Sequence, residues 1–148
     1  MHFFRTKIEK LRIGWNERTL TEDDFHRLCR RFGIKVQEMP LRVCGFYYRV
    51  KGKNFIAIDS KLTGAKKLSV MFHELGHFLF HAPESGATAN FHGVGHRTRK
   101  ECEADVFALC AILPKEMISK RSSDELLDEG FEPEIIQQRY EIFKRFGL

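Results

Sequence analysis

The stretch LSVMFHELGHFLF, residues 68–80, decides the fold of this 148-residue chain. If the stretch is helical, its own apolar side chains occupy every side of the helix, which is typical of a helix buried in a protein core. We expect this helix to begin near residues 63–65. Three polar residues, His73, Glu74 and His77, interrupt the apolar run. Because burial penalises polar groups that lack partners, a bound metal ion is a physically favourable way to accommodate them.

The five residues His73 to His77 form an H-E-x-x-H motif, which is typical of zinc hydrolases. Positions i and i+4 of an α-helix lie on one face, so His73 and His77 can direct their imidazoles at one point. Glu74 is rotated by about 100° from His73, beside the metal rather than on it. This is the position of a general base. The alternative, two helix histidines paired with water or backbone, fits a buried helix less well.

A catalytic zinc site usually has three protein ligands and an open position, so a third ligand is expected elsewhere in the chain. The predicted helix over residues 99–113 offers Glu101, Glu103 and Asp105. Three apolar residues share the face of Glu103: Phe107, Cys110 and Ala111. We therefore expect Glu103 to be the ligand, with Glu101 as the reserve candidate. Asp105 could accept a ring N–H from a ligand histidine and so orient it.

The residues before the H-E-x-x-H helix predict a helix followed by a small sheet. Thr21 can cap a helix that stops at Gly33. The segment 34–36 alternates between apolar and polar residues, as a short strand does. Residues 43–50 and 55–59 are predicted to form a β-hairpin around the turn residues between them.

The residues after the helix predict a loop and three further helices. Residues 82–98 are rich in Gly, Ser, Pro and Thr and are expected to form a long loop. The helix over 99–113 ends at a proline, a capping-box sequence opens a shorter helix at 122–130, and an amphipathic helix follows over 133–147. The whole pattern predicts an α+β fold, in which a small β-sheet packs on the buried H-E-x-x-H helix and further helices follow it.

Composition favours one folded domain over residues 1–148. The hydrophobic fraction is 43% and the charged fraction is 30%, as in ordinary globular proteins. The four cysteines form no C-x-x-C pair, and the N-terminus lacks the apolar run of a signal peptide. No apolar stretch approaches transmembrane length. We therefore expect reduced thiols, a cytoplasmic location and no membrane partner.

The net charge of +5 indicates a modestly basic surface. Its basic clusters are interpreted as solvated helix faces rather than as a nucleic-acid site. No helix-turn-helix, RNP or zinc-finger pattern is present in the sequence. Direct binding to nucleic acid is therefore not expected.

Several segments, taken in order, resemble the ImmA/IrrE family of zincin-like metallopeptidases. Residues 45–47 and 56–59 are similar to the strands that precede the family's active-site helix. Residues 72–81, FHELGHFLFH, are similar to its core motif, and residues 101–108 with 113–114 are similar to its E-x-E-A-x-x-F-A…P segment. The order of the segments makes the resemblance specific.

This resemblance implies a compact gluzincin-like peptidase. Zinc would be held by His73, His77 and Glu103, and Glu74 would be the catalytic base. It also implies a cytoplasmic enzyme that cleaves or inactivates a helix-turn-helix repressor in stress responses or mobile-element control. Many family members carry a helix-turn-helix domain, whereas this chain has no room for one, so the repressor would be a separate protein. The alternative is a regulatory protein that keeps the zinc site but acts on its partner by binding rather than by cleavage.

An oxyanion-stabilising residue is also needed, and the sequence leaves five candidates open: His92, His96, Arg97, Tyr47 and Tyr48.

Two further questions concern the metal and the substrate. His81 lies one turn beyond His77, where it can be a ligand or, as we expect, a helix-end histidine. An extended substrate is expected to pair with an exposed strand edge near residues 55–59.

Overall fold

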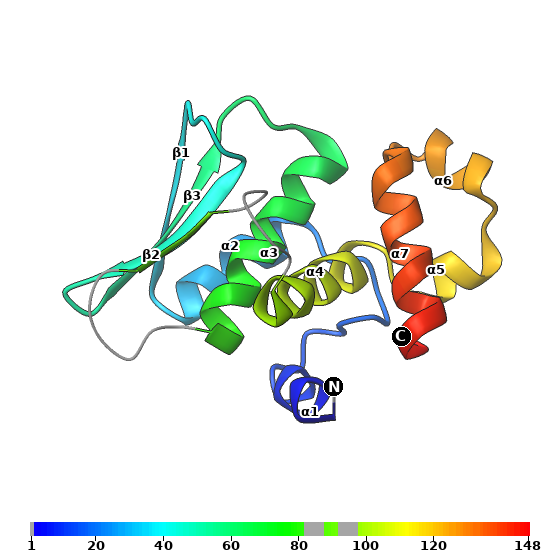
Figure 1. Cartoon of the computed structure of the whole chain (residues 1–148), viewed down its shortest axis with the longest axis horizontal. Coiled ribbons are helices and arrows are strands. Elements are labelled where there is room, and N and C mark those ends of the chain that lie inside the picture. Colours follow the sequence, from blue (N-terminus) through cyan, green and yellow to red (C-terminus); the bar gives the residue numbers. More distant parts are fainter. Residues whose placement is uncertain (1, 82–87, 92–97) are drawn as a thin grey trace.

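A four-stranded sheet lies at one end of the molecule and the three C-terminal helices at the other, with the helices that carry the H-E-x-x-H motif and the acidic residues 101–105 between them (Figure 1). This computed structural model describes residues 2–81, 88–91 and 98–148. The helices are α1 (His2–Glu9), α2 (Glu22–Arg31), α3 (Gly64–His81), α4 (Arg99–Ile112), α5 (Lys115–Lys120), α6 (Ser123–Asp128) and α7 (Pro133–Phe146). The strands are β1 (Ile34–Met39), β2 (Gly45–Val50), β3 (Lys53–Asp59) and β4 (Thr88–Phe91). The predicted α+β fold is confirmed.

The strands are arranged in the order β1-β3-β2-β4. β2 and β3 form the predicted antiparallel hairpin, and β1 pairs with β3 in parallel, with Val36 opposite Ile56. β4 pairs with β2 in antiparallel orientation, so part of the expected 82–98 loop is a strand. Because β3 is paired on both sides, the expectation of a free substrate-binding edge near residues 55–59 is wrong. The two outer strands of the described sheet are β1 and β4.

Helix α3 covers one face of the sheet, as its sequence predicts. Residues 70–77 of α3 are all buried, and Tyr47 of β2 meets the ring of Phe78 at a centroid distance of 5.9 Å. The first turn of α3 is anchored by Lys67, whose Nζ lies 2.8 Å from Glu38 Oε1 on β1 and 2.9 Å from Glu22 Oε1 on α2. These contacts place the H-E-x-x-H segment between the sheet and the remaining helices.

Helices α3 and α4 approach each other closely at Gly76. A Cβ atom on Gly76 would lie 3.3 Å from the Cα of Ala104 and 3.3 Å from a ring carbon of Phe107. Both Ala104 and Phe107 are fully buried. The absence of a side chain at Gly76 therefore lets the backbone of α4 pack against the H-E-x-x-H turn.

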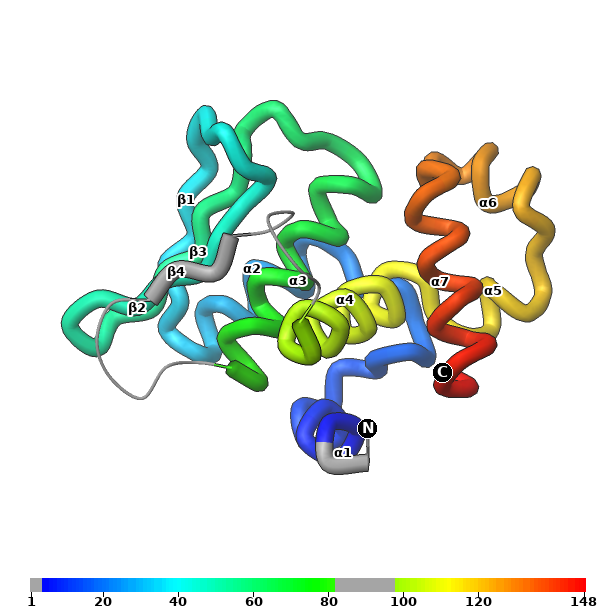
Figure 2. The backbone as a smooth tube through the Cα atoms, in the orientation of Figure 1, coloured from blue at the N-terminus to red at the C-terminus, as the bar shows by residue number. Residues whose placement is uncertain are grey.

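The N-terminal segment packs against the ends of these two helices, and Figure 2 shows it crossing beneath α4. The ring of Phe4 in α1 lies 4.6 Å from that of Phe80, and the indole N–H of Trp15 donates to the Phe107 carbonyl at 2.9 Å. The sequence had not predicted α1 or the short helix α5.

A buried arginine ties the C-terminal helix to the rest of the fold. Arg139 of α7 is fully buried and donates to the main-chain oxygens of Leu113 and Leu148 and to Asn16 Oδ1, at 2.6, 2.9 and 3.0 Å. The predicted caps are confirmed nearby and at α2: Ser122 and Thr21 each complete a capping box.

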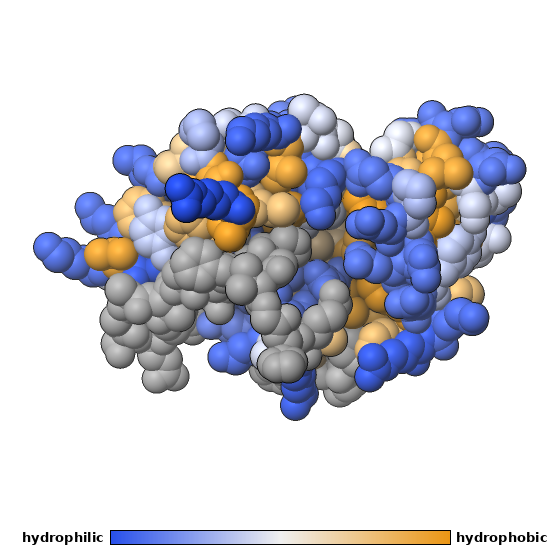
Figure 3. Space-filling model, turned by 45° about the horizontal axis from the view of Figure 1, so that its top comes forward, coloured by the Kyte–Doolittle hydropathy of each residue, from blue (hydrophilic) through white to orange (hydrophobic). Residues whose placement is uncertain are grey.

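On the face shown in Figure 3, hydrophobic residues form separate patches between hydrophilic ones. Val50 and Leu127 are the large hydrophobic residues that are exposed among the described part of the chain. In that same part, every helix falls short of the length or the apolar character that crossing a membrane requires.

Candidate metal centre

The two histidines of the motif point toward each other from one face of α3, as the i, i+4 spacing predicts. His73 and His77 are each 1% exposed, and their Nε2 atoms lie 3.1 Å apart. Two imidazole nitrogens at this distance cannot both be protonated without repulsion. The pair is therefore arranged to share a bound cation or a proton.

Glu101 of α4 completes the arrangement. One carboxylate oxygen, Oε2, lies 3.0 Å from His73 Nε2, and the other, Oε1, lies 3.0 Å from His77 Nε2, so the carboxylate bridges the two ligand nitrogens. Neighbouring ligands of a tetrahedral zinc ion are about 3.4 Å apart, given metal–ligand distances of about 2.1 Å. His73, His77 and Glu101 are accordingly the group in the described structure whose donor atoms can hold a metal ion.

The structure corrects the expectation that Glu103 faces the two histidines. The Glu103 carboxylate instead accepts from Arg99 Nε at 3.1 Å and lies 3.6 Å from His81 Nε2. The reason is the rotation of α4, because Ala104 is the residue that packs against Gly76. At about 100° per residue, Glu101 falls on one flank of Ala104 and Glu103 on the other.

Asp105 lies where the sequence suggested a residue that could orient a ligand histidine. Its Oδ1 lies 2.7 Å from His73 Nδ1, on the side of the ring away from the metal-binding nitrogen. Burial by itself would lower the pKa of His73, but hydrogen bonds to Asp105 and Glu101 raise it to about 9. The hydrogen bond to Asp105 also sets the tautomer, because it keeps the proton on Nδ1 and leaves Nε2 for a ligand.

Glu74 is the remaining polar residue of the motif. Its side chain is fully buried, and within the described residues neither carboxylate oxygen accepts a well-formed hydrogen bond, although the Tyr47 backbone is near enough to lower its pKa. Burial raises the pKa of Glu74 to about 8, although His73 opposes the shift. Positive charge bound by His73, His77 and Glu101 would favour the ionised carboxylate further. The residue is thus a buried base next to the candidate ligands.

The other predicted candidates lie elsewhere. His81 Nδ1 lies 3.2 Å from His77 Nδ1, which is the ring nitrogen of His77 that faces away from the ligand cluster. The Tyr47 hydroxyl donates to Asn54 Oδ1 at 2.7 Å, and the Tyr48 hydroxyl to Gln37 Oε1 at 3.4 Å. Both hydroxyls are thus engaged within the sheet. His92, His96 and Arg97 lie outside the described residues.

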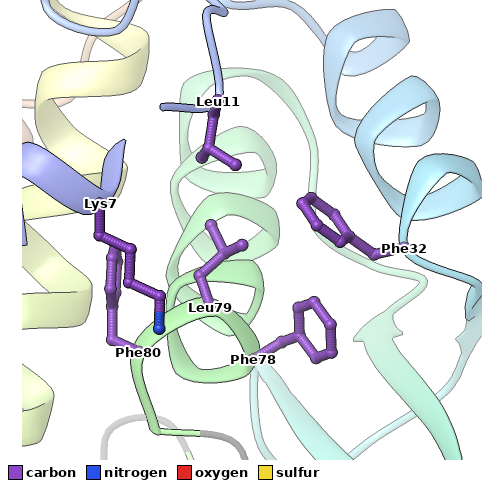
Figure 4. Close-up of a pocket in the computed structure, with 6 residues that line it drawn as sticks. All are labelled: Lys7, Leu11, Phe32, Phe78, Leu79 and Phe80. Carbon is purple, nitrogen blue, oxygen red and sulfur yellow. The ribbon is translucent and has the colours of Figure 1, made fainter. Parts of the chain in front are cut away.

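A separate cavity of about 350 Å³ lies beside the end of α3 (Figure 4). It is lined mainly by apolar side chains, with Lys7 at one side: Lys7, Leu11, Phe32, Phe78, Leu79 and Phe80. None of these residues belongs to the ligand cluster. The cavity is therefore distinct from the candidate metal centre.

Two imidazoles and a carboxylate that converge on one point, with a buried glutamate next to the first histidine, define a site of the metal-dependent hydrolase class. The chain belongs to the family described as IrrE N-terminal-like domain, Peptidase_M78, whose family model matches residues 29–146. The match includes α3 and α4, which carry the site. No curated protein and no solved structure matches the chain. Membership of this family makes the chain a metallopeptidase-like domain and suggests a metal at the His-His-Glu group.

Proposed function

We propose that this protein is a zinc-dependent endopeptidase that hydrolyses a peptide bond in a partner protein. The observation that carries the proposal is the convergence of His73, His77 and Glu101 beside the buried carboxylate of Glu74. A purely structural metal site would have no need of a further buried carboxylate beside its ligands. The family membership of residues 29–146 supports the same conclusion.

Zinc fits this donor set. Two histidine nitrogens and one carboxylate are a common protein ligand set of catalytic zinc, and a fourth position is then left for water or substrate. A zinc ion bound there supplies Lewis-acid chemistry, since it lowers the pKa of water and polarises a carbonyl oxygen. Magnesium and calcium, which prefer all-oxygen sites, fit two imidazoles poorly.

The residues of the chain have distinct tasks in the proposed reaction. Glu74 takes a proton from the attacking water, holds it on its carboxylate and delivers it to the nitrogen of the departing amine. Its burial makes it a strong proton acceptor and keeps bulk water from competing for the proton. Asp105 keeps the His73 ring in one orientation through the 2.7 Å contact.

We further propose that the substrate is a separate helix-turn-helix repressor, cut in a stress response or in mobile-element control, and that the enzyme works in the cytoplasm. The support is the family resemblance. The competing function is regulation by binding alone, with the metal site kept as a structural element. The two functions differ in whether the Glu74 carboxylate is required.

The test is to express the chain together with its genomic neighbour and to compare wild type with Glu74→Gln. Glu116→Gln is a matched control, because Glu116 is an exposed helix glutamate far from the ligand cluster. We expect all three proteins to bind zinc, and only Glu74→Gln to leave the partner intact by mass spectrometry. A Glu74→Gln variant that regulates the partner as well as wild type does would contradict the proposed peptidase and favour regulation by binding.

A further inference from the structure

The two candidate ligand histidines are supported differently at their second ring nitrogen. His73 Nδ1 lies against the carboxylate of Asp105 at 2.7 Å. His77 Nδ1 lies against another histidine, with His81 Nδ1 at 3.2 Å. Metal-binding histidines generally need a partner at this nitrogen, which fixes the ring and its tautomer. Among the described residues, His81 thus stands at His77 Nδ1 where Asp105 stands at His73 Nδ1.

The second ring nitrogen of His81, Nε2, faces the carboxylate of Glu103. Its side chain is 6% exposed, its Nε2 is buried without a hydrogen-bond partner among the described residues, and Glu103 Oε2 lies 3.6 Å from this nitrogen. Glu103 is in turn held by Arg99, whose Nε donates to Oε1 at 3.1 Å. The buried Nε2 and the restrained carboxylate are thus aligned, and a shift of a few tenths of an ångström would bring them to hydrogen-bond distance.

We propose that His81 and Glu103 form a positioning pair for the metal ligand His77, an inference that rests on the proposed zinc site. His77 can give Nε2 to the metal only if its proton is on Nδ1. That N–H then donates to His81 Nδ1, so the proton of His81 is on Nε2, and it points at Glu103. The scheme needs only neutral rings and places every proton between a donor and an acceptor.

The pair also explains why α4 carries acidic residues on both flanks of Ala104. Asp105 supports His73 directly from one flank. Glu103 supports His77 from the other flank, and because it is farther away, it acts through the ring of His81. Each ligand histidine would then be supported by a carboxylate of α4, directly for His73 and through His81 for His77. These carboxylates stabilise the cationic character that metal binding induces in the rings.

The test measures zinc affinity by competition with a chromophoric chelator, using Zn²⁺ alone, three test variants and two control variants. His81→Asn keeps an acceptor, since its amide oxygen is as many bonds from the backbone as Nδ1, whereas His81→Phe keeps the ring but removes both nitrogens. Glu103→Gln removes the charge behind His81. The controls are His26→Phe, a helix histidine remote from the site with a glutamate at 3.8 Å, and Glu116→Gln, which like Glu103 is paired with a cation four residues away.

We expect His81→Phe to weaken zinc binding about 10- to 100-fold, as the loss of a ligand's supporting partner usually does. His81→Asn should stay within about threefold of wild type, and Glu103→Gln should fall between these two because a neutral acceptor is weaker. Both controls should match wild type. In the zinc-loaded protein, the His77 Nδ1–H proton should be visible by NMR in wild type and His81→Asn and lost in His81→Phe.

A packing role for His81 predicts the opposite order, with His81→Phe binding like wild type and His81→Asn weakened, and this result would overturn the inference. Equal zinc affinity for Glu103→Gln and Glu116→Gln would show that Glu103 does not support His77. This comparison of the two glutamine variants can be made even if His81→Phe does not fold. If wild type itself fails to bind zinc, the proposed function fails. If wild type binds and His81→Phe binds equally well, only the positioning role fails.

Discussion

The same substitution at two positions of α4, Glu101→Gln and Glu103→Gln, should have very different effects on zinc binding. Glu101 places its oxygens 3.0 Å from both ligand nitrogens, whereas Glu103 lies 3.6 Å from His81, which is not a ligand. Glu101→Gln removes a charged ligand, and the loss should exceed the about 10- to 100-fold that is typical of supporting residues. We expect at least a hundredfold weaker binding, or about 2.7 kcal/mol.

Two measurements check this magnitude. Chelator competition gives the affinities directly. At a fixed excess of free zinc, the added resistance to urea unfolding should fall by about 2.7 kcal/mol in Glu101→Gln, since stabilisation follows the logarithm of ligand concentration over Kd. Glu103→Gln should retain most of that stabilisation. If Glu103→Gln loses as much as Glu101→Gln, or more, α4 must present its other flank to the histidines, and the described ligand set is incorrect.

Three further predictions follow from the contacts around the site and at α2. Asp105→Asn should weaken zinc binding about 10- to 100-fold in the same competition assay, because the His73 ring loses its carboxylate. Gly76→Ala should lower both the urea midpoint and the zinc affinity: the new methyl forces α4 outward against the Cα of Ala104, an overpacking cost of about 1–3 kcal/mol that exceeds the helix-propensity gain of at most about 1 kcal/mol. A more stable variant would contradict this packing. The Arg18 hydrogen bond lowers the pKa of Asp24 to about 2 despite burial, so this carboxylate stabilises the fold above pH 4 and loses its effect as pH falls toward 2. Because Arg18 is half exposed and the pair is screened by water, Asp24→Asn should cost about 1 kcal/mol at pH 7 by urea unfolding, and the difference should shrink below pH 4.

The elements that were predictable are those whose determinants lie close together in the sequence. Thr21 and Ser122 form their capping boxes with residues three positions away, and the β2–β3 hairpin closes through its own turn. The buried character of α3 follows from its composition. By contrast, the parallel pairing of β1 with β3 and the pairing of β4 with β2 join segments far apart in the chain, and no local pattern specifies them.

The identity of the third candidate ligand could not be predicted from neighbouring residues alone. Burial of neighbouring residues pointed to Glu103, because Phe107, Cys110 and Ala111 are indeed all buried. An inward face, however, is wide enough to include residues on both flanks of a helix. The spacing of Glu101 and Asp105, four residues apart on one flank, was a usable signal, since one can act as ligand while the other orients a histidine.

By itself, the sequence determined that His73 and His77 share a face, that Glu74 stands beside them and that the helix carrying all three is buried. These properties follow from the 3.6-residue period and from composition, which act within one helix. Only the tertiary structure decided that Glu101 rather than Glu103 meets the histidines, that His81 and Glu103 lie behind His77, and that Arg139 is buried. The rotation of one helix against another depends on a close contact such as that of Gly76 with Ala104, which forms between segments nearly 30 residues apart and appears only when the chain is folded.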